Sequence, residues 1–167
     1  MCSSDLSTKA ARTIEGRFSA IFAGNPTPAA VADASDERLR AVGLGPQKLK
    51  YVRGLCGRIL DGSLKLEALA SLTDDEVIAA LTSVKGIGRW TAEMFLMFRL
   101  HRPDVLPLGD LGIVKAVQRA YKLRAVPSPE RLTKLGETWR PYRSVACWYL
   151  WASLAPRPVK TSKNGRG

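Results

Sequence analysis

Apolar residues recur at steps of three and four along almost the whole chain, which is the period of an amphipathic helix. The first such series comprises Leu6, Ala10, Ala11, Ile14, Phe18, Ile21 and Phe22. No stretch alternates apolar and polar residues convincingly, as a half-buried strand does, and no segment repeats at a fixed period. The pattern therefore predicts an all-α fold of about nine or ten short helices joined by short links.

Proline, glycine and capping residues divide this pattern into helices. A cap at Asp5 or Ser7 is expected to begin the first helix, which residues 25–28 interrupt. Further helices are expected over about residues 36–42, 46–60, 64–72, 74–82, 89–100 and 111–121, from about 129, and from about 139 to before 156. Thr73 is the expected cap of the helix that begins at Asp74.

The charge balance favours a polyanionic partner. The 167 residues carry 26 Lys and Arg against 15 Asp and Glu, a formal net charge of +11. The last twelve residues hold four of these cations and no acid, so the rest of the chain is also basic. Nucleic acid fits this balance, although a basic enzyme with no nucleic-acid role would show it too. The length predicts one domain, or two small lobes that share a core, over residues 1–155, followed by a flexible basic tail over 156–167.

Several classes of protein are excluded. No apolar run comes near the ~20 residues needed to cross a bilayer, and the N-terminus lacks the layout of a secretory signal. Cys2, Cys56 and Cys147 are far apart and none is in a Cys-x-x-Cys pair. They cannot build a zinc site or a four-cysteine iron–sulfur cluster. We expect a reducing compartment, with Cys56 and Cys147 as buried free thiols.

The most specific stretch is the turn at residues 84–88 between two expected helices. Gly86 and Gly88 let the backbone turn tightly and approach a ligand closely. A helix N-terminus follows, where the dipole favours an anion, and Lys85 and Arg89 add positive charge. The turn is predicted to hold one phosphate of a nucleic-acid backbone without reading its sequence. The alternative is an ordinary link between helices, in which the glycines serve only the turn.

Asp110 is the carboxylate that stands out. It follows a loop containing Pro107 and Gly109 and stands at the start of an apolar helix. Its structural role would be an N-cap that accepts hydrogen bonds from the next turn. A cap also fixes the carboxylate in place, so a chemical role is compatible with the structural one. Asp104, directly after Pro103, is expected to serve the turn instead.

Aromatic residues crowd the C-terminal region. Five fall within thirteen positions, beside Arg140 and Arg143, and these are Trp139, Tyr142, Trp148, Tyr149 and Trp151. Aromatic faces next to arginines can stack nucleic-acid bases. The alternative, which we expect for most of the five, is a place in the helical core.

In order and spacing, residues 84–92, 104–112 and 139–151 resemble the helix-hairpin-helix-GPD superfamily of DNA glycosylases, most closely its 3-methyladenine DNA glycosylase II branch. The resemblance covers about residues 5–153. It implies an all-α, two-lobed helical bundle, with a helix-hairpin-helix motif at about 82–100 and an active-site cleft between the lobes. The later start of this chain implies an N-terminally shortened form. Ser4 and Asp5 stand where that branch usually has Gln-Gln.

The resemblance also implies a set of reactive residues. Asp110 takes the position of the essential catalytic aspartate. Trp90 stands where bifunctional members carry a nucleophilic lysine, so no Schiff base and no lyase step are expected. Trp151 falls where the branch places a base-stacking tryptophan, and Met94 where one relative has a pocket tyrosine. Trp90, Met94 and Trp151 are therefore the implied substrate-binding residues.

The hairpin is the implied DNA-binding element. Its contact residues are Lys85, Gly86, Ile87, Gly88 and Arg89. The main-chain carbonyls of Thr82, Val84 and Ile87 match positions that hold a monovalent cation, Na⁺ or K⁺, in relatives. No metal or organic cofactor is expected in the chemistry.

The implied activity is monofunctional excision of alkylated purines such as 3-methyladenine or 7-methylguanine, flipped out of double-stranded damaged DNA before hydrolysis of the N-glycosidic bond. We expect a monomer with no membrane partner, in the nucleus of a eukaryote or the cytoplasm of a bacterium. Two alternatives stay open, a DNA-binding module with little or no catalysis and a basic all-α protein–protein adaptor. Base release separates the enzyme from the module, and a steep loss of DNA binding with salt excludes the adaptor.

Overall fold

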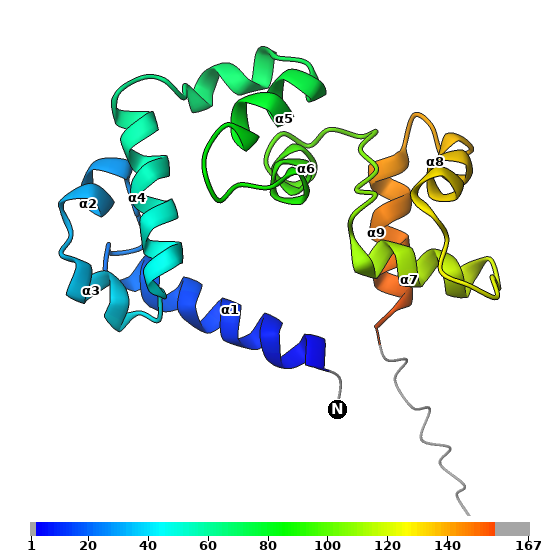
Figure 1. Ribbon diagram of the computed structural model, residues 1–167, viewed down its shortest axis with the longest axis horizontal. Coiled ribbons are helices and arrows are strands. Elements are labelled where there is room, and N and C mark those ends of the chain that lie inside the picture. Colours follow the sequence, from blue (N-terminus) through cyan, green and yellow to red (C-terminus); the bar gives the residue numbers. More distant parts are fainter. Residues whose placement is uncertain (1–2, 156–167) are drawn as a thin grey trace, which may run out of the picture. The chain divides into compact units, whose positions relative to one another are not determined.

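The computed structural model describes residues 3–155, with side chains from residue 10 onward, and over this range the protein is entirely helical (Figure 1). The elements are α1 (Ser3–Ala20), α2 (Pro28–Asp33), α3 (Asp36–Ala41), α4 (Pro46–Leu60), the 3-10 helix η1 (Leu66–Ser71), α5 (Asp74–Thr82), α6 (Arg89–Phe98), α7 (Leu111–Ala120), α8 (Pro129–Glu137) and α9 (Arg143–Ser153). This confirms the predicted all-α class. None of these helices is both long and apolar enough to span a membrane.

The chain divides into two compact units, residues 1–92 and 93–167. The helix α6 begins in the first unit and continues into the second. The hairpin that precedes α6 therefore belongs to the first unit, whereas Asp110 and the aromatic block belong to the second.

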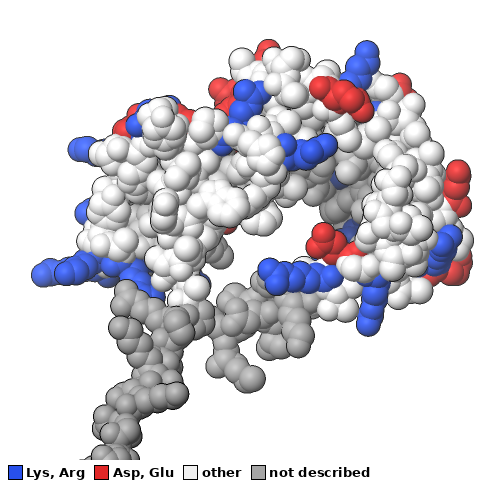
Figure 2. All heavy atoms as spheres, turned by 180° about the vertical axis from the view of Figure 1, so that it is seen from behind, with Lys and Arg blue, Asp and Glu red and all other residues white. Residues whose placement is uncertain are grey.

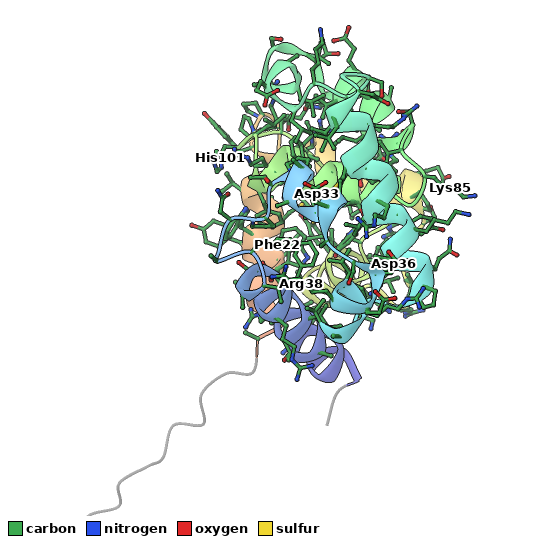
Figure 3. All side chains as sticks on the ribbon, turned by 90° about the vertical axis from the view of Figure 1, so that its left-hand side faces the viewer. Phe22, Asp33, Asp36, Arg38, Lys85 and His101 are labelled. Atoms are coloured by element: carbon green, nitrogen blue, oxygen red, sulfur yellow. The ribbon has the colours of Figure 1, made fainter. Side chains whose placement is uncertain are left out.

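The core of the first unit lies where α4 packs against α2 and α3. Three buried residues form its centre and four partly buried ones cover them, namely Ala34, Leu39 and Leu49 with Phe18, Ile21, Phe22 and Leu44. The guanidinium of Arg38 lies 5.8 Å from the centroid of the Phe22 ring and donates to the Ile21 carbonyl (Figure 3). The end of α1 and the turn after it are thereby joined to α3.

Arg53 ties α4 to the end of α2. Its guanidinium donates to the carbonyls of Val31, Ala32 and Ala34, and it contacts Asp36 at 3.0 Å. The last carbonyls of a helix lack partners within it, so a cation placed there satisfies them and suits the helix dipole. This contact fixes the helix that runs beside the hairpin.

The second unit is built around α7 packed on α9. Its buried side chains come from α6, the following loop and α7 to α9, and include Leu96, Met97, Val105, Pro107, Ile113, Ala116, Val117, Leu132 and Cys147. Gly136 in α8 lets the loop pack closely, because a Cβ there would stand 2.5 Å from Cδ2 of Leu106. The loop before Asp110 is therefore part of the core.

Local capping signals predicted several helix starts correctly. Thr73 caps α5 and forms a reciprocal pair of hydrogen bonds with Glu76. Pro46 and Pro129 occupy the first turns of α4 and α8, which begin where they were predicted, and the structure adds Ser128 as the cap of α8. The free thiols of Cys56 and Cys147 are buried, as predicted, and Cys2 lies outside the described residues.

Other boundaries differ from the prediction. Helix α1 already runs from Ser3, so neither Asp5 nor Ser7 is its cap. Residues 64–72 hold a 3-10 helix rather than an α-helix, and the six-residue helix α2 was not predicted. The last helix starts at Arg143 rather than near residue 139. Pro141 disfavours a helical conformation at the residue before it, so this stretch forms a turn instead.

Candidate active site and nucleic-acid interface

Asp110 is the N-cap of α7. Its Oδ1 accepts a hydrogen bond from the backbone N–H of Ile113 at 2.8 Å, and only 8 % of the residue is exposed. The predicted capping role is confirmed. The cap holds a carboxylate at the positive end of a ten-residue helix, where the dipole stabilises negative charge.

Trp151 donates a second hydrogen bond to the same carboxylate oxygen. Its indole Nε1 lies 3.0 Å from Asp110 Oδ1, across 41 residues of sequence. The structure thus brings together the predicted catalytic residue and the predicted base-stacking residue. Two N–H donors on one oxygen fix the carboxylate and stabilise its charge.

Gly112 makes room for this pair. A Cβ at Gly112 would lie 3.0 Å from Asp110 Oδ1 and 3.1 Å from Trp151 Cδ1, tighter than ordinary contact. The absence of a side chain at this position lets the indole reach the carboxylate. Sequence analysis assigned Gly112 no role, because a glycine in the first turn of a helix carries no sign of a partner 39 residues away.

The Trp151 ring belongs to an aromatic cluster of the second unit that is centred on Phe98. It stacks on Phe98 with ring centroids 5.9 Å apart and an interplanar angle of 23°. Phe98 in turn meets Trp148 edge to face at 5.4 Å. Met94, one turn before Phe98 in α6, is half-buried in the same unit. Trp151 is likewise half-buried, so part of the indole stays accessible.

The expectation that most of the aromatic block forms helix core is wrong. Tyr142, Trp148 and Tyr149 are 61 %, 56 % and 76 % exposed. Trp139 is half-buried and donates to the Tyr121 hydroxyl at 3.1 Å. Along α9 the buried positions are taken by the small residues Ser144 and Cys147, so the large rings point elsewhere.

Asp104 holds the loop before Asp110 onto α9. Its carboxylate accepts two hydrogen bonds from the Arg143 guanidinium at 2.7 and 3.0 Å and one from Arg140 at 2.7 Å. Burial raises the pKa of Asp104, but the hydrogen bonds and charge of Arg143, together with Arg140, outweigh burial and lower it below its usual range. Asp104 was expected only to serve its own turn, but it also binds the loop to Arg143 of α9 and to Arg140.

Ser144 joins the same loop to α9 by three hydrogen bonds. Its N–H donates to the Pro103 carbonyl at 2.9 Å, and its hydroxyl donates to the Arg102 carbonyl at 2.7 Å and accepts from the Val105 N–H at 2.9 Å. The loop that leads to Asp110 and the helix that carries Trp151 therefore form one framework. It holds the two residues at a fixed separation.

Cys147 lies buried within this framework. Burial raises the pKa of its thiol to about 12, and the negative charges of Asp110 and Glu93 act in the same direction. The thiol is protonated at neutral pH and is no nucleophile. Glu93, only 3 % exposed, is a buried acid that sequence analysis did not single out.

The hairpin in the first unit forms a tight turn. The Ile87 N–H donates to the Val84 carbonyl at 3.0 Å, and Gly86 in between has φ +98°. A Cβ at Gly86 would stand 2.2 Å from the Tyr51 ring. The predicted role of Gly86 in the turn is confirmed. Its close packing on the Tyr51 ring of α4 was not predicted.

Gly88 differs from Gly86. A Cβ at Gly88 would meet no atom within 4 Å, and its φ is not in the left-handed region. Its carbonyl accepts from Ala92, so Gly88 stands at the N-terminus of α6. The fold leaves open space at Gly88, which suits close approach of a ligand to the backbone.

The remaining residues of the hairpin differ in how far their side chains are exposed. Lys85 and Arg89 are exposed, and the Lys85 side chain points away from the ribbon (Figure 3). Val84 is buried and Ile87 half-buried, which anchors the turn. Thr82 ends α5 and is exposed. Trp90, next along α6, is 50 % exposed and belongs to the first unit.

The basic side chains are not confined to the hairpin. Figure 2 shows Lys and Arg side chains at several places on the face seen from behind. Among the described residues no three His, Cys, Asp or Glu side chains gather as a metal site. Positive charge that is spread over several places on the surface suits a long polyanion more than a single small ligand.

Comparison with known proteins identifies relatives of this chain. The family described as "HhH-GPD superfamily base excision DNA repair protein" matches residues 1–141. The chain is 35 % identical to DNA-3-methyladenine glycosylase 1 of Schizosaccharomyces pombe, over 98 % of this chain and 75 % of that protein. It is 33 % identical to the putative DNA-3-methyladenine glycosylase YfjP of Bacillus subtilis, over 77 % of this chain and 45 % of that protein. The chain thus spans less than half the length of the Bacillus relative.

Several solved structures share the fold. One of them is the 3-methyladenine DNA glycosylase Mag1 of Schizosaccharomyces pombe in complex with abasic DNA, with a TM-score of 0.81 and 35 % identity. The match covers 90 % of this chain and 75 % of that one.

Proposed function

The chain belongs to the HhH-GPD superfamily of base excision DNA repair proteins, and on that premise we propose that it is a monofunctional DNA glycosylase for alkylated purines. The observation that carries the proposal is the carboxylate of Asp110, held by the Ile113 N–H and the Trp151 indole. Relatives named DNA-3-methyladenine glycosylases support the choice of substrate class.

Asp110 acts on the sugar. As the N-glycosidic bond breaks, the sugar gains positive charge, and a fixed carboxylate stabilises that charge without having to reorganise. The two hydrogen bonds to Oδ1 hold the carboxylate in place before the substrate arrives. Water then completes the hydrolysis, leaving the free base and an abasic site.

Trp151 acts on the base. A purine alkylated at N3 or N7 carries positive charge, which an indole face attracts. The base must first leave the duplex, and damaged bases leave most easily. Trp90 and Met94 are the other proposed substrate-binding residues.

The reaction stops at the abasic site. Trp90 stands where bifunctional members of the family carry a nucleophilic lysine, and an indole cannot form a Schiff base. The Cys147 thiol offers no substitute, since it is fully buried and a thiol cannot form a Schiff base either. We therefore propose base release without strand cleavage.

The hairpin holds the DNA. Lys85 and Arg89 supply positive charge, and Gly88 leaves the start of α6 open to a phosphate. The carbonyls of Thr82, Val84 and Ile87 are proposed to hold Na⁺ or K⁺. Val84 already accepts one hydrogen bond from Ile87, so its second lone pair is the one available to a cation. We also propose that the protein acts on double-stranded DNA as a monomer.

The test is base release by the wild-type protein. Duplex DNA treated with a methylating agent is incubated with the protein, and released bases are separated by chromatography. We expect 3-methyladenine or 7-methylguanine in the supernatant and abasic sites without strand breaks. Tight, salt-sensitive DNA binding with no released base would instead leave a non-catalytic DNA-binding module.

A further inference from the structure

A basic hollow lies beside the hairpin in the first unit. Its volume is about 280 Å³. Its walls come from α4 and from the turn after α5, and its lining residues are Lys50, Tyr51, Gly54, Arg58, Ser83, Val84 and Lys85. The hollow thus includes Val84 and Lys85 of the turn but not Gly88 or Arg89.

The charged residues that line the hollow are all cations. Lys50, Arg58 and Lys85 line it, and no Asp or Glu does. Arg58 is held in place, since its Nη1 donates to the Ser83 hydroxyl at 2.6 Å. A pre-oriented guanidinium together with two lysines is a donor set suited to a phosphate.

Gly54 opens the side of this hollow. Lys50, Gly54 and Arg58 follow one another at steps of four, so they share one face of α4. Glycine is a poor residue for the middle of a helix, and a Cβ at Gly54 would meet no atom within 4 Å. Internal packing therefore does not require glycine at this position, as it does not at Gly57. Gly54 differs from Gly57 in lining the hollow, where the missing side chain leaves room for a ligand close to the helix.

We propose that the hollow binds a second backbone phosphate of the DNA strand, next to the phosphate held by the hairpin. The proposal rests on the proposed function, because it takes duplex DNA as the partner. Lys50, Arg58 and Lys85 neutralise the phosphate, and Gly54 leaves room for it against α4. The contact adds affinity for DNA of any sequence.

A matched pair of charge variants tests the hollow. Gly57 is a second glycine of α4 at which an added Cβ would meet no atom within 4 Å, and it does not line the hollow. Gly54→Glu and Gly57→Glu change the net charge of the protein equally. Binding to an undamaged duplex is measured by fluorescence anisotropy. Since a carboxylate placed beside a phosphate repels it, we expect Gly54→Glu to bind at least about tenfold more weakly than Gly57→Glu.

A second pair separates binding from folding. Gly54→Ala and Gly57→Ala both place a better helix former in α4, so each raises the melting temperature by about 2–4 °C. Only Gly54→Ala is expected to weaken DNA binding. A variant that is more stable and yet binds less tightly supports a ligand site at Gly54. Equal affinities within both glycine pairs overturn the proposal.

The salt dependence gives an independent measure. Removing one phosphate contact with Lys50→Gln lowers the slope of log affinity against log salt by about 1. An unchanged slope overturns the proposal. Failure of the proposed function is a different result, namely no base release by the wild-type protein while the glycine pairs still differ in DNA binding.

Discussion

The indole Nε1 of Trp151 lies 3.0 Å from Oδ1 of Asp110, and this hydrogen bond joins the end of α9 to the start of α7. It places an aromatic ring and a carboxylate beside each other. The proposed function needs this arrangement, with the ring for the departing base and the carboxylate for the cationic sugar. The surrounding hydrogen bonds of Asp104 and Ser144 hold the two helices and the loop around this pair.

Trp151→Phe tests the hydrogen bond while keeping an aromatic ring. Losing a hydrogen bond to a charged group costs about 1.5–3 kcal/mol, so the single-turnover rate of base release should fall about 10–100-fold. Trp148→Phe is the control, since Trp148 is 56 % exposed and Phe preserves its edge-to-face partner role with Phe98. Equal rates for the two variants would show that the indole N–H is dispensable.

Gly112→Ala tests the space that the pair needs. Its Cβ would crowd Asp110 Oδ1 and Trp151 Cδ1, so we expect base release to fall about 10–100-fold through misplacement of the reacting groups. Gly109→Ala is the matched control, because a Cβ at Gly109 meets no atom within 4 Å. Single-turnover rates on methylated duplex DNA make the comparison, and activity retained by Gly112→Ala would contradict it.

Asp104→Asn tests the contacts that hold the loop before Asp110 onto α9. Loss of the charge that binds Arg143 and Arg140 should lower the free energy of unfolding by about 1–3 kcal/mol at pH 7, measured by urea denaturation. The pKa of Asp104 is lowered in the folded protein, so this stabilisation is present above its ordinary value of about 3.9 and is lost as the pH falls through the folded value. The wild-type and variant stabilities should therefore converge in acid. A difference that stays constant with pH would rule out the ionic contribution.

The two hairpin glycines should behave differently. In Gly86→Ala the added Cβ would clash with the Tyr51 ring, and the alanine would have to adopt a positive φ. We therefore expect the free energy of unfolding to fall by at least about 2 kcal/mol. Gly88→Ala should fold normally and bind DNA of any sequence about tenfold more weakly, as expected for one lost phosphate contact. Thermal melting and anisotropy measure the two effects. Normal DNA binding by Gly88→Ala would place the phosphate elsewhere.

Local signals in the sequence predicted much of the fold. The caps at Thr73 and Asp110 and the first-turn prolines act within three or four residues, so their helices could be located without the structure. Helix α2 was missed because six residues show too little periodicity to detect.

Contacts between distant residues could not be predicted in the same way. Asp104 lies 39 residues from Arg143, and the Tyr51 ring that excludes a side chain at Gly86 lies in another helix. The exposure of Tyr142, Trp148 and Tyr149 depends on which face of α9 packs on α7, and aromatic composition alone does not reveal that face.

We propose that the Asp110 carboxylate drives loss of the base, and Asp110→Asn tests this role. In Asp110→Asn the side-chain oxygen can still accept from Ile113 and Trp151, so folding and DNA binding should persist. The single-turnover rate of base release from methylated duplex DNA should fall about 100-fold or more, since the charge that stabilises the sugar is gone. A rate close to that of the wild-type protein would contradict the account.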